Sequence, residues 1–115
     1  MTEADLYRLL ASLANGQVYP YVVPLGSDGQ PSISAPWVTF SIITDVASDV
    51  LYGQAESAVS VQVDVYSSSI TEAREIRDRA LDELQVLKPE NIVKTPGYEP
   101  DLRYHRATLE FQVTV

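Results

Sequence analysis

Residues 58–66, AVSVQVDVY, carry the clearest structural signal in the chain, because four valines alternate with polar or larger residues. A β-strand points successive side chains to opposite faces of its sheet, so this period of two predicts a strand with one buried and one polar face. Residues 37–44, WVTFSIIT, are rich in β-branched and aromatic side chains and predict another strand. Residues 106–115 alternate in the same way and predict a long closing strand. The sequence therefore predicts a protein built on a β-sheet.

Two amphipathic helices are predicted beside these strands. Thr2 can cap a first helix whose leucines recur at helical spacing until Asn15-Gly16 ends it. Ser69 and Glu72 have the spacing of a capping box, and the helix that they begin is stopped by Pro89. Each helix has one apolar stripe, so both are expected to pack on the same face of the sheet.

The remaining segments predict connections and weaker strands. Residues 17–36 hold four of the seven prolines and predict a long surface loop, with a short extended piece at Val18-Tyr19. Residues 50–57 predict a more polar strand, joined to the preceding one by a turn at 45–49. A short strand is possible at 92–94.

Taken together, these elements predict one α+β domain over residues 1–115, in the order α-β-β-β-α-β. The sheet is expected to be antiparallel or mixed, with two helices packed on one face. The opposite face is expected to be polar and to carry Ser60, Gln62, Asp64, Tyr66, Tyr104, Arg106, Glu110 and Gln112.

The charge is negative and unevenly distributed. The chain has 115 residues and a net charge of −8, from 16 acids and 8 bases. Seven acids and one base lie in residues 1–69, and nine acids and seven bases follow. This balance argues against a general nucleic-acid binder, which needs cations to neutralise phosphates, and against docking to an anionic membrane. The chain has no cysteine, no signal-peptide pattern and no apolar run long enough to cross a bilayer, which predicts a protein made in a cytosol.

No combination of residues predicts catalysis. His105 is the only histidine, and its strand parity places it with Ala107 and Leu109 on the apolar side. Ser67–Ser69 are explained by helix capping, and Asp45 and Asp49 by turn formation. Walker, dinucleotide-binding and nucleophile-elbow motifs are absent from the sequence. We therefore expect no enzyme, and no catalytic, cofactor or metal site.

The aromatic residues allow two interpretations. Tyr19, Tyr21 and Trp37 flank the proline-rich loop, and Tyr66 and Tyr104 belong to the predicted polar face. They either cover the rim of a small core or form an interface, where Tyr and Trp are enriched. The sequence leaves both open, although an open polar face without a catalytic constellation favours binding or assembly.

Three stretches in this order resemble a known family. The first is Val18-Tyr19-Pro20 followed by a proline-rich loop that ends at Trp37. The second is residues 61–66, VQVDVY, followed by a helix that contains Glu72-Ala73-Arg74. The third is residues 98–101, YEPD, followed by Tyr104-His105-Arg106 and the closing strand. Together they are similar to the tail terminator and tail completion proteins of long-tailed, siphophage-like phages, the family of the lambda tail terminator.

The resemblance implies a structural protein of the virion, assembled in the host cytoplasm. Such proteins form a homo-oligomeric ring, usually a hexamer, between the tail tube protein below and the head–tail connector above. The ring stops tube polymerisation and lets DNA pass through without specific binding, away from any membrane. On this reading, the candidates for acids that face the hole are Asp45, Asp49, Glu56 and Asp64. The candidates for subunit or partner contacts are Tyr19, Tyr21, Trp37, Tyr66, Arg74, Arg103, Tyr104 and Arg106.

The alternatives stay open at this point. A head–tail adaptor, neck protein or other minor tail protein would fit the same resemblance. A small-ligand-binding α+β domain, a small enzyme and a regulatory protein-binding module belong to other classes. The mass of the purified protein separates a ring of about six subunits from a monomeric module.

Overall fold

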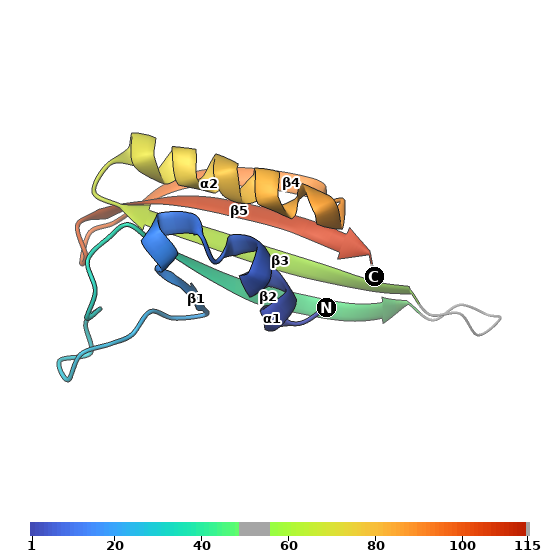
Figure 1. Ribbon diagram of the computed structural model, residues 1–115, viewed down its shortest axis with the longest axis horizontal. Helices are drawn as coiled ribbons and strands as arrows, with labels where there is room; N and C mark the ends of the chain where they lie inside the picture. The colour runs from blue at the N-terminus through green and yellow to red at the C-terminus, as the bar shows by residue number, and fades with distance from the viewer. Residues whose placement is uncertain (49–55, 115) are drawn as a thin grey trace.

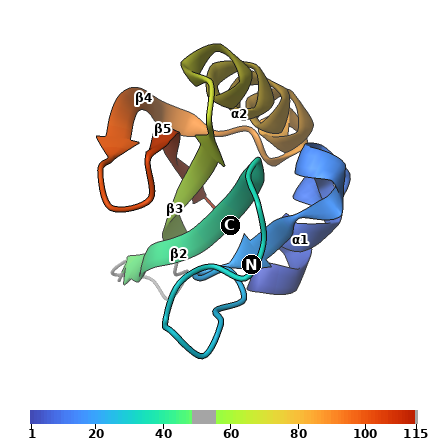
Figure 2. The same ribbon diagram turned by 90° about the vertical axis from the view of Figure 1, so that its left-hand side faces the viewer.

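Two helices cover one face of a five-stranded sheet in the computed structural model, which describes residues 1–48 and 56–114 (Figure 1). The elements in chain order are α1 (Glu3–Leu10), the 3-10 turn η1 (Leu13–Gly16), β1 (Val18–Pro20), β2 (Trp37–Ser48), β3 (Glu56–Ser67), α2 (Ile70–Leu84), the 3-10 turn η2 (Gln85–Leu87), β4 (Glu90–Glu99) and β5 (Tyr104–Thr114). The predicted α+β class is confirmed, and so is the packing of both helices on one face (Figure 2).

The strands lie in the order β1-β2-β3-β5-β4. β1 runs parallel to β2, and every other neighbouring pair is antiparallel, so the sheet is mixed. The three strands before α2 are β1, β2 and β3. The first of them, β1, contains the short extended piece that was predicted at Val18-Tyr19. β4 spans ten residues, which makes the possible strand at 92–94 a full member of the sheet.

The predicted turn at 45–49 is wrong over residues 45–48, because β2 continues through Ser48 and pairs there with Glu56. β-branched residues surround this stretch, and pairing with β3 outweighs the turn preference of Asp45. Glu56 and Ser57 begin β3 rather than ending a separate strand. The rest of that predicted strand, residues 50–55, and Asp49 lie outside the described residues.

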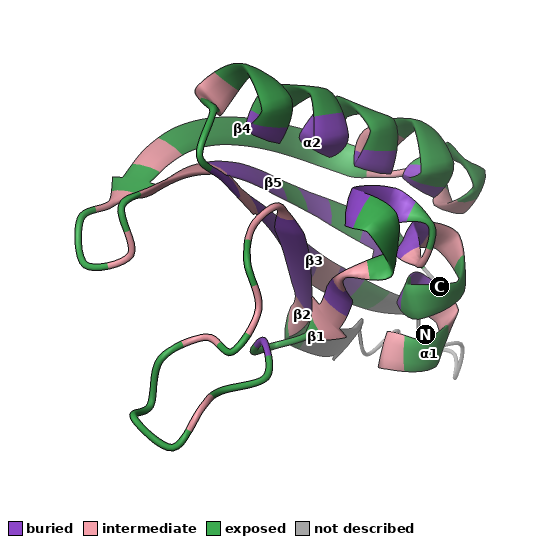
Figure 3. Ribbon diagram, turned by 60° about the vertical axis from the view of Figure 1, so that its left-hand side comes forward, coloured by how far each residue is buried: buried purple, intermediate pink, exposed green. Residues whose placement is uncertain are grey.

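The hydrophobic core lies between the helices and the sheet. Val59, Val61, Val63 and Val65 are fully buried there, as the alternation in residues 58–66 predicts (Figure 3). They pack in one cluster with apolar residues of both helices, of the η1 turn and of the other strands; these are Leu6, Leu10, Leu13, Ala14, Val18, Val38, Phe40, Ala73, Ile76, Ala80, Leu84, Ala107, Leu109, Phe111 and Val113. Burying one such aliphatic or aromatic side chain contributes about 1.5–3 kcal/mol, so this face dominates the stability of the fold.

Both helices begin at the predicted caps. Thr2 caps α1, and its backbone N–H donates to the Asp5 carboxylate at 2.9 Å. The hydroxyl of Ser69 accepts a hydrogen bond from the Glu72 backbone N–H at 3.3 Å and starts α2. α1 is shorter than predicted, because it ends at Leu10, and Ala14 and Asn15 have left-handed backbone conformations. No helix within the described residues is long and apolar enough to span a membrane.

The molecule is elongated, 51 × 30 × 24 Å, and its two ends differ (Figure 1). The loop end carries residues 21–36 and the β4–β5 turn. At the hairpin end, β2 and β3 extend beyond both helices. The strands run between these ends, so the two edges of the sheet form the long sides of the molecule.

Candidate functional site: the open face of the sheet

The open face is the face of the sheet opposite the helices, and the strand register arranges its side chains in rows across four strands. From the loop end, the first row is Trp37, Tyr66, Arg106 and Gly97. The second row is Thr39, Asp64, Thr108 and Thr95. The third row is Ser41, Gln62, Glu110 and Val93. The predicted polar face is therefore present, and it also contains Trp37 and the threonines, which were not among its predicted members.

Three aromatic rings gather at the first row. The Trp37 ring lies 5.4 Å from the Tyr66 ring and 5.2 Å from the Tyr104 ring, where the contact is edge-to-face. Trp37 is only 2% exposed, although it lies outside the core between helices and sheet. Such aromatic pairs contribute about 0.5–1.5 kcal/mol beyond the area that they bury. The open face thus has a small core of its own at the loop end.

Arg106 is held inside the same row. Its guanidinium forms an ion pair with Glu99 of β4, and both side chains are about one-third exposed. A Cβ on Gly97 would lie 3.2 Å from the Nε and Nη2 atoms of Arg106, so the glycine gives the guanidinium room to lie over β4. Burial raises the pKa of the Tyr66 hydroxyl, with a further contribution from Asp64, while Arg106 acts in the opposite direction.

The second row is held by a hydrogen-bonded carboxylate. Asp64 is 8% exposed, and its Oδ1 atom accepts a bond of 2.6 Å from the Thr108 hydroxyl. Its Oδ2 atom accepts a bond of 2.9 Å from the Gln62 amide. Buried carboxylates persist where donors satisfy their oxygens, and these two side chains supply donors from β5 and from β3 itself.

The proline-rich segment, residues 21–36, closes the loop end of this face. The Gln17 amide donates to the carbonyls of Ser34 at 2.8 Å and Pro36 at 2.7 Å and fixes the return of the segment to β2. Val23 is buried, although it lies in the segment that the sequence predicts as a surface loop. A groove of about 370 Å³ lies between the segment and the β4–β5 turn; it is lined by Val22, Leu25, Trp37, Tyr66, Asp101 and Leu102, among others.

The structure brings together half of the candidate contact residues. Trp37, Tyr66, Tyr104 and Arg106 form the cluster at the first row, where Trp37 has almost no free surface. Tyr21 is 55% exposed and donates its hydroxyl hydrogen to Glu3 at 2.8 Å. The other three do not belong to the aromatic cluster: Tyr19 is half-buried on β1, Arg74 is exposed on α2, and Arg103 is exposed just before β5.

The candidate lumen acids do not form one cluster in the described part of the chain. Asp64 is enclosed in the second row, whereas the backbone positions of Asp45 and Glu56 lie on β2 and β3 toward the hairpin end. Asp49 lies outside the described residues. Glu110, which was predicted on the polar face but is not one of the candidate lumen acids, is an exposed acid in the third row. Their orientation in a ring stays a prediction.

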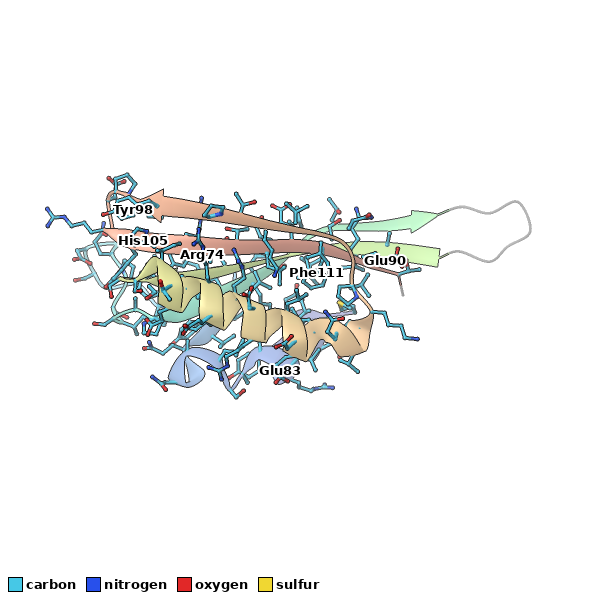
Figure 4. The ribbon with its side chains drawn as sticks, turned by 90° about the horizontal axis from the view of Figure 1, so that it is seen from above. Arg74, Glu83, Glu90, Tyr98, His105 and Phe111 are labelled. Carbon is cyan, nitrogen blue, oxygen red and sulfur yellow. The ribbon has the colours of Figure 1, made fainter. Side chains whose placement is uncertain are left out.

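His105 lies at the edge of the helix side, as its parity predicts. Its ring contacts Tyr98 of β4 edge-to-face at 5.0 Å, and the two side chains lie together at one end of β4 and β5 (Figure 4). Within the described residues, no group of three histidine, cysteine or acidic residues is placed to hold a metal ion. The local partner of His105 is therefore an aromatic ring.

The fold is similar to that of a chain in the virion of a native gene transfer agent particle. The two chains are 16% identical in sequence and superpose with a TM-score of 0.59, over 99% of this chain and 86% of the other. At this identity, the similarity establishes a shared fold. No protein-family model matches the chain, and no curated protein matches its sequence.

Proposed function

We propose that this chain is a structural subunit of a phage-like virion. In this proposal, copies form a ring that caps the head-proximal end of the tail tube, stops its polymerisation and joins the tail to the head connector. The observation that carries the proposal is the fold similarity to a virion chain of a gene transfer agent, because it extends over 99% of this chain. The tail terminator resemblance of the sequence points to the same class of protein. The role is structural rather than catalytic.

The shape of the subunit supports a position between two partners. The strands run the length of the molecule between the loop end and the hairpin end, so a ring with its axis along the strands presents these ends on opposite faces. The loop end exposes Tyr21, Val22 and Leu25, each more than half exposed, and such apolar groups are typical of protein contacts. One ring face would then meet the tube protein and the other the connector.

The open face is suited to line the hole of such a ring. The helices occupy the other face, and the open face carries neutral polar groups together with the exposed acid Glu110. The Arg106 guanidinium is paired with Glu99 and lies within the first row, so it is poorly placed to bind a phosphate. Negative charge repels DNA only within about 8 Å at physiological salt, so the open face must approach the DNA closely. A map of the ring with this face outward would refute the assignment.

The cap role is tested in two measurements on the full chain. Native mass spectrometry is expected to show a discrete species of about six copies, six times the subunit mass of 12.7 kDa. The tube protein of the same particle is then polymerised with and without the chain and viewed by negative-stain electron microscopy. Tubes of unlimited length alone, and short tubes with one capped end in its presence, are expected. Tubes whose length and ends do not respond to the chain would overturn the cap role, and binding to the connector alone would favour the adaptor.

A further inference from the structure

Both long edges of the sheet carry strand segments without a partner. β1 covers β2 only as far as Phe40, where the Tyr21 backbone N–H also donates to the Phe40 carbonyl at 2.8 Å. From Ser41 onward, no described strand pairs with the outer edge of β2, although the Tyr21 hydroxyl lies against the Ile42 backbone there. β4 is the last strand of the sheet, so its outer edge is free over Glu90–Glu99 among the described residues. Free edges present unpaired N–H and C=O groups that accept another strand.

These edges are only partly protected against strand pairing: the register shifts between Ile42 and Thr44 on β2 and between Glu90 and Val93 on β4, and β4 carries the charges of Glu90 and Lys94. Residues 41–44, SIIT, contain no charge and no proline, and Ile43 is 50% exposed. On β4, Val93 is 53% exposed. Lys94 is drawn toward α2, where its Nζ atom lies 3.2 Å from an Asp78 carboxylate oxygen. Pro96 protects only the part of β4 that lies toward the loop end, so residues 90–95 are the accessible half.

The two free segments match in height and direction. Ser41 registers with Gln62, Gln62 with Glu110, and Glu110 with Val93, so Ser41 and Val93 lie level on opposite edges. Three antiparallel pairings separate β2 from β4, and the two strands therefore run in opposite directions. A rotation about an axis along the strands keeps the direction of each strand. It therefore brings β4 of one copy antiparallel to β2 of the next at the same height.

We propose that subunits join edge to edge, with residues 90–93 of β4 on one copy paired with residues 41–44 of β2 on the next. The partner is a second copy of this chain, because one head-to-tail contact satisfies both free edges at once and repeats around a closed ring. The sheets would then form one continuous wall, with Val93 of one copy opposite Ser41 and diagonal to Ile43 of the next. This proposal rests on the ring in the proposed function and names the contact that closes it.

Disulfide trapping tests the pairing directly, because the chain has no cysteine of its own. The pair Ser41→Cys with Val93→Cys is expected to give a covalent ladder of subunits on a non-reducing gel. A second pair, Ile43→Cys with Val93→Cys, covers a register two residues away. Ser41 and Val93 of one chain are three strand spacings apart, about 14 Å, which is beyond the reach of about 7 Å between Cα atoms that a disulfide allows. A ladder therefore reports contacts between copies.

The control is Ser41→Cys with Glu110→Cys, because Glu110 lies level with Ser41 on β5, which is interior to the sheet. This pair should give no ladder. As a check that does not use cysteines, Val93→Lys should abolish the multi-copy species in native mass spectrometry. Val86→Lys, at a side chain that is 70% exposed outside both edges, should preserve it. Circular dichroism confirms that each variant is folded.

The outcomes separate the two proposals. Suppose that the wild-type chain forms a ring. If neither cysteine pair then gives cross-links, or if the ring persists in the Val93→Lys variant, edge pairing is overturned and the proposed ring stands. A wild-type chain that makes no ring, alone or on tail tubes, overturns the proposed function and the pairing with it. A ladder that extends to the full ring confirms the junction.

Discussion

The two faces of β3 show how one strand serves two purposes. Its valines face the helices and are fully buried, so that side of the sheet is a continuous apolar surface. Between them, Ser60, Gln62, Asp64 and Tyr66 face away from the helices, and only the rows near the loop end are enclosed. The helix face therefore holds the fold together, and the open face remains available for contacts. Substitutions on neighbouring residues of one strand can test this division.

The largest effect is expected from Leu109→Ala, which removes a fully buried side chain from the helix face. The cavity and the lost burial should lower the free energy of unfolding by about 2–5 kcal/mol, measured by urea denaturation. Its matched control is Glu110→Ala, at the next residue on the open face, which should change stability by less than about 0.5 kcal/mol. Equal losses in the two variants would contradict the division between the faces.

A smaller effect is expected within the enclosed part of the open face. Thr108→Val keeps the volume of the side chain but removes the donor at 2.6 Å from Asp64, leaving Gln62 as the remaining side-chain donor. A buried acceptor that loses its partner costs about 1–3 kcal/mol. Thr95→Val, in the same row on exposed β4, is the control and should be nearly neutral. A stable Thr108→Val variant would show that water replaces the hydroxyl at Asp64.

The sequence predicts faces well because strand parity is local, and it predicts partners poorly because they are distant. The alternation in residues 58–66 was sufficient to assign the buried valines and the polar side of β3. The same parity made Asp64 a candidate lumen acid, but its enclosure depends on Thr108, which lies 44 residues away. Trp37 is similar: its place at the start of a strand is evident, whereas the contacts with Tyr66 and Tyr104 follow from register. The sheet edges also required the structure, since strand order determines which strands lack a neighbour.

The smallest effect is expected in the pH dependence of stability that arises from Tyr66 on the open face. Burial raises the pKa of Tyr66 in the folded chain above its unfolded value of about 10, so the folded state holds this proton more tightly. The stability from the neutral hydroxyl is complete below pH 10 and is lost as the pH rises through the folded pKa. The free energy of unfolding should therefore fall above about pH 10, and Tyr66→Phe should make the fall shallower. Tyr7→Phe, on exposed α1, provides the control. Chemical denaturation at roughly pH 9 to 11 measures how the free energy of unfolding falls with pH. If Tyr66→Phe leaves that fall unchanged, the first row does not exclude water from Tyr66, and the open face lacks a core of its own.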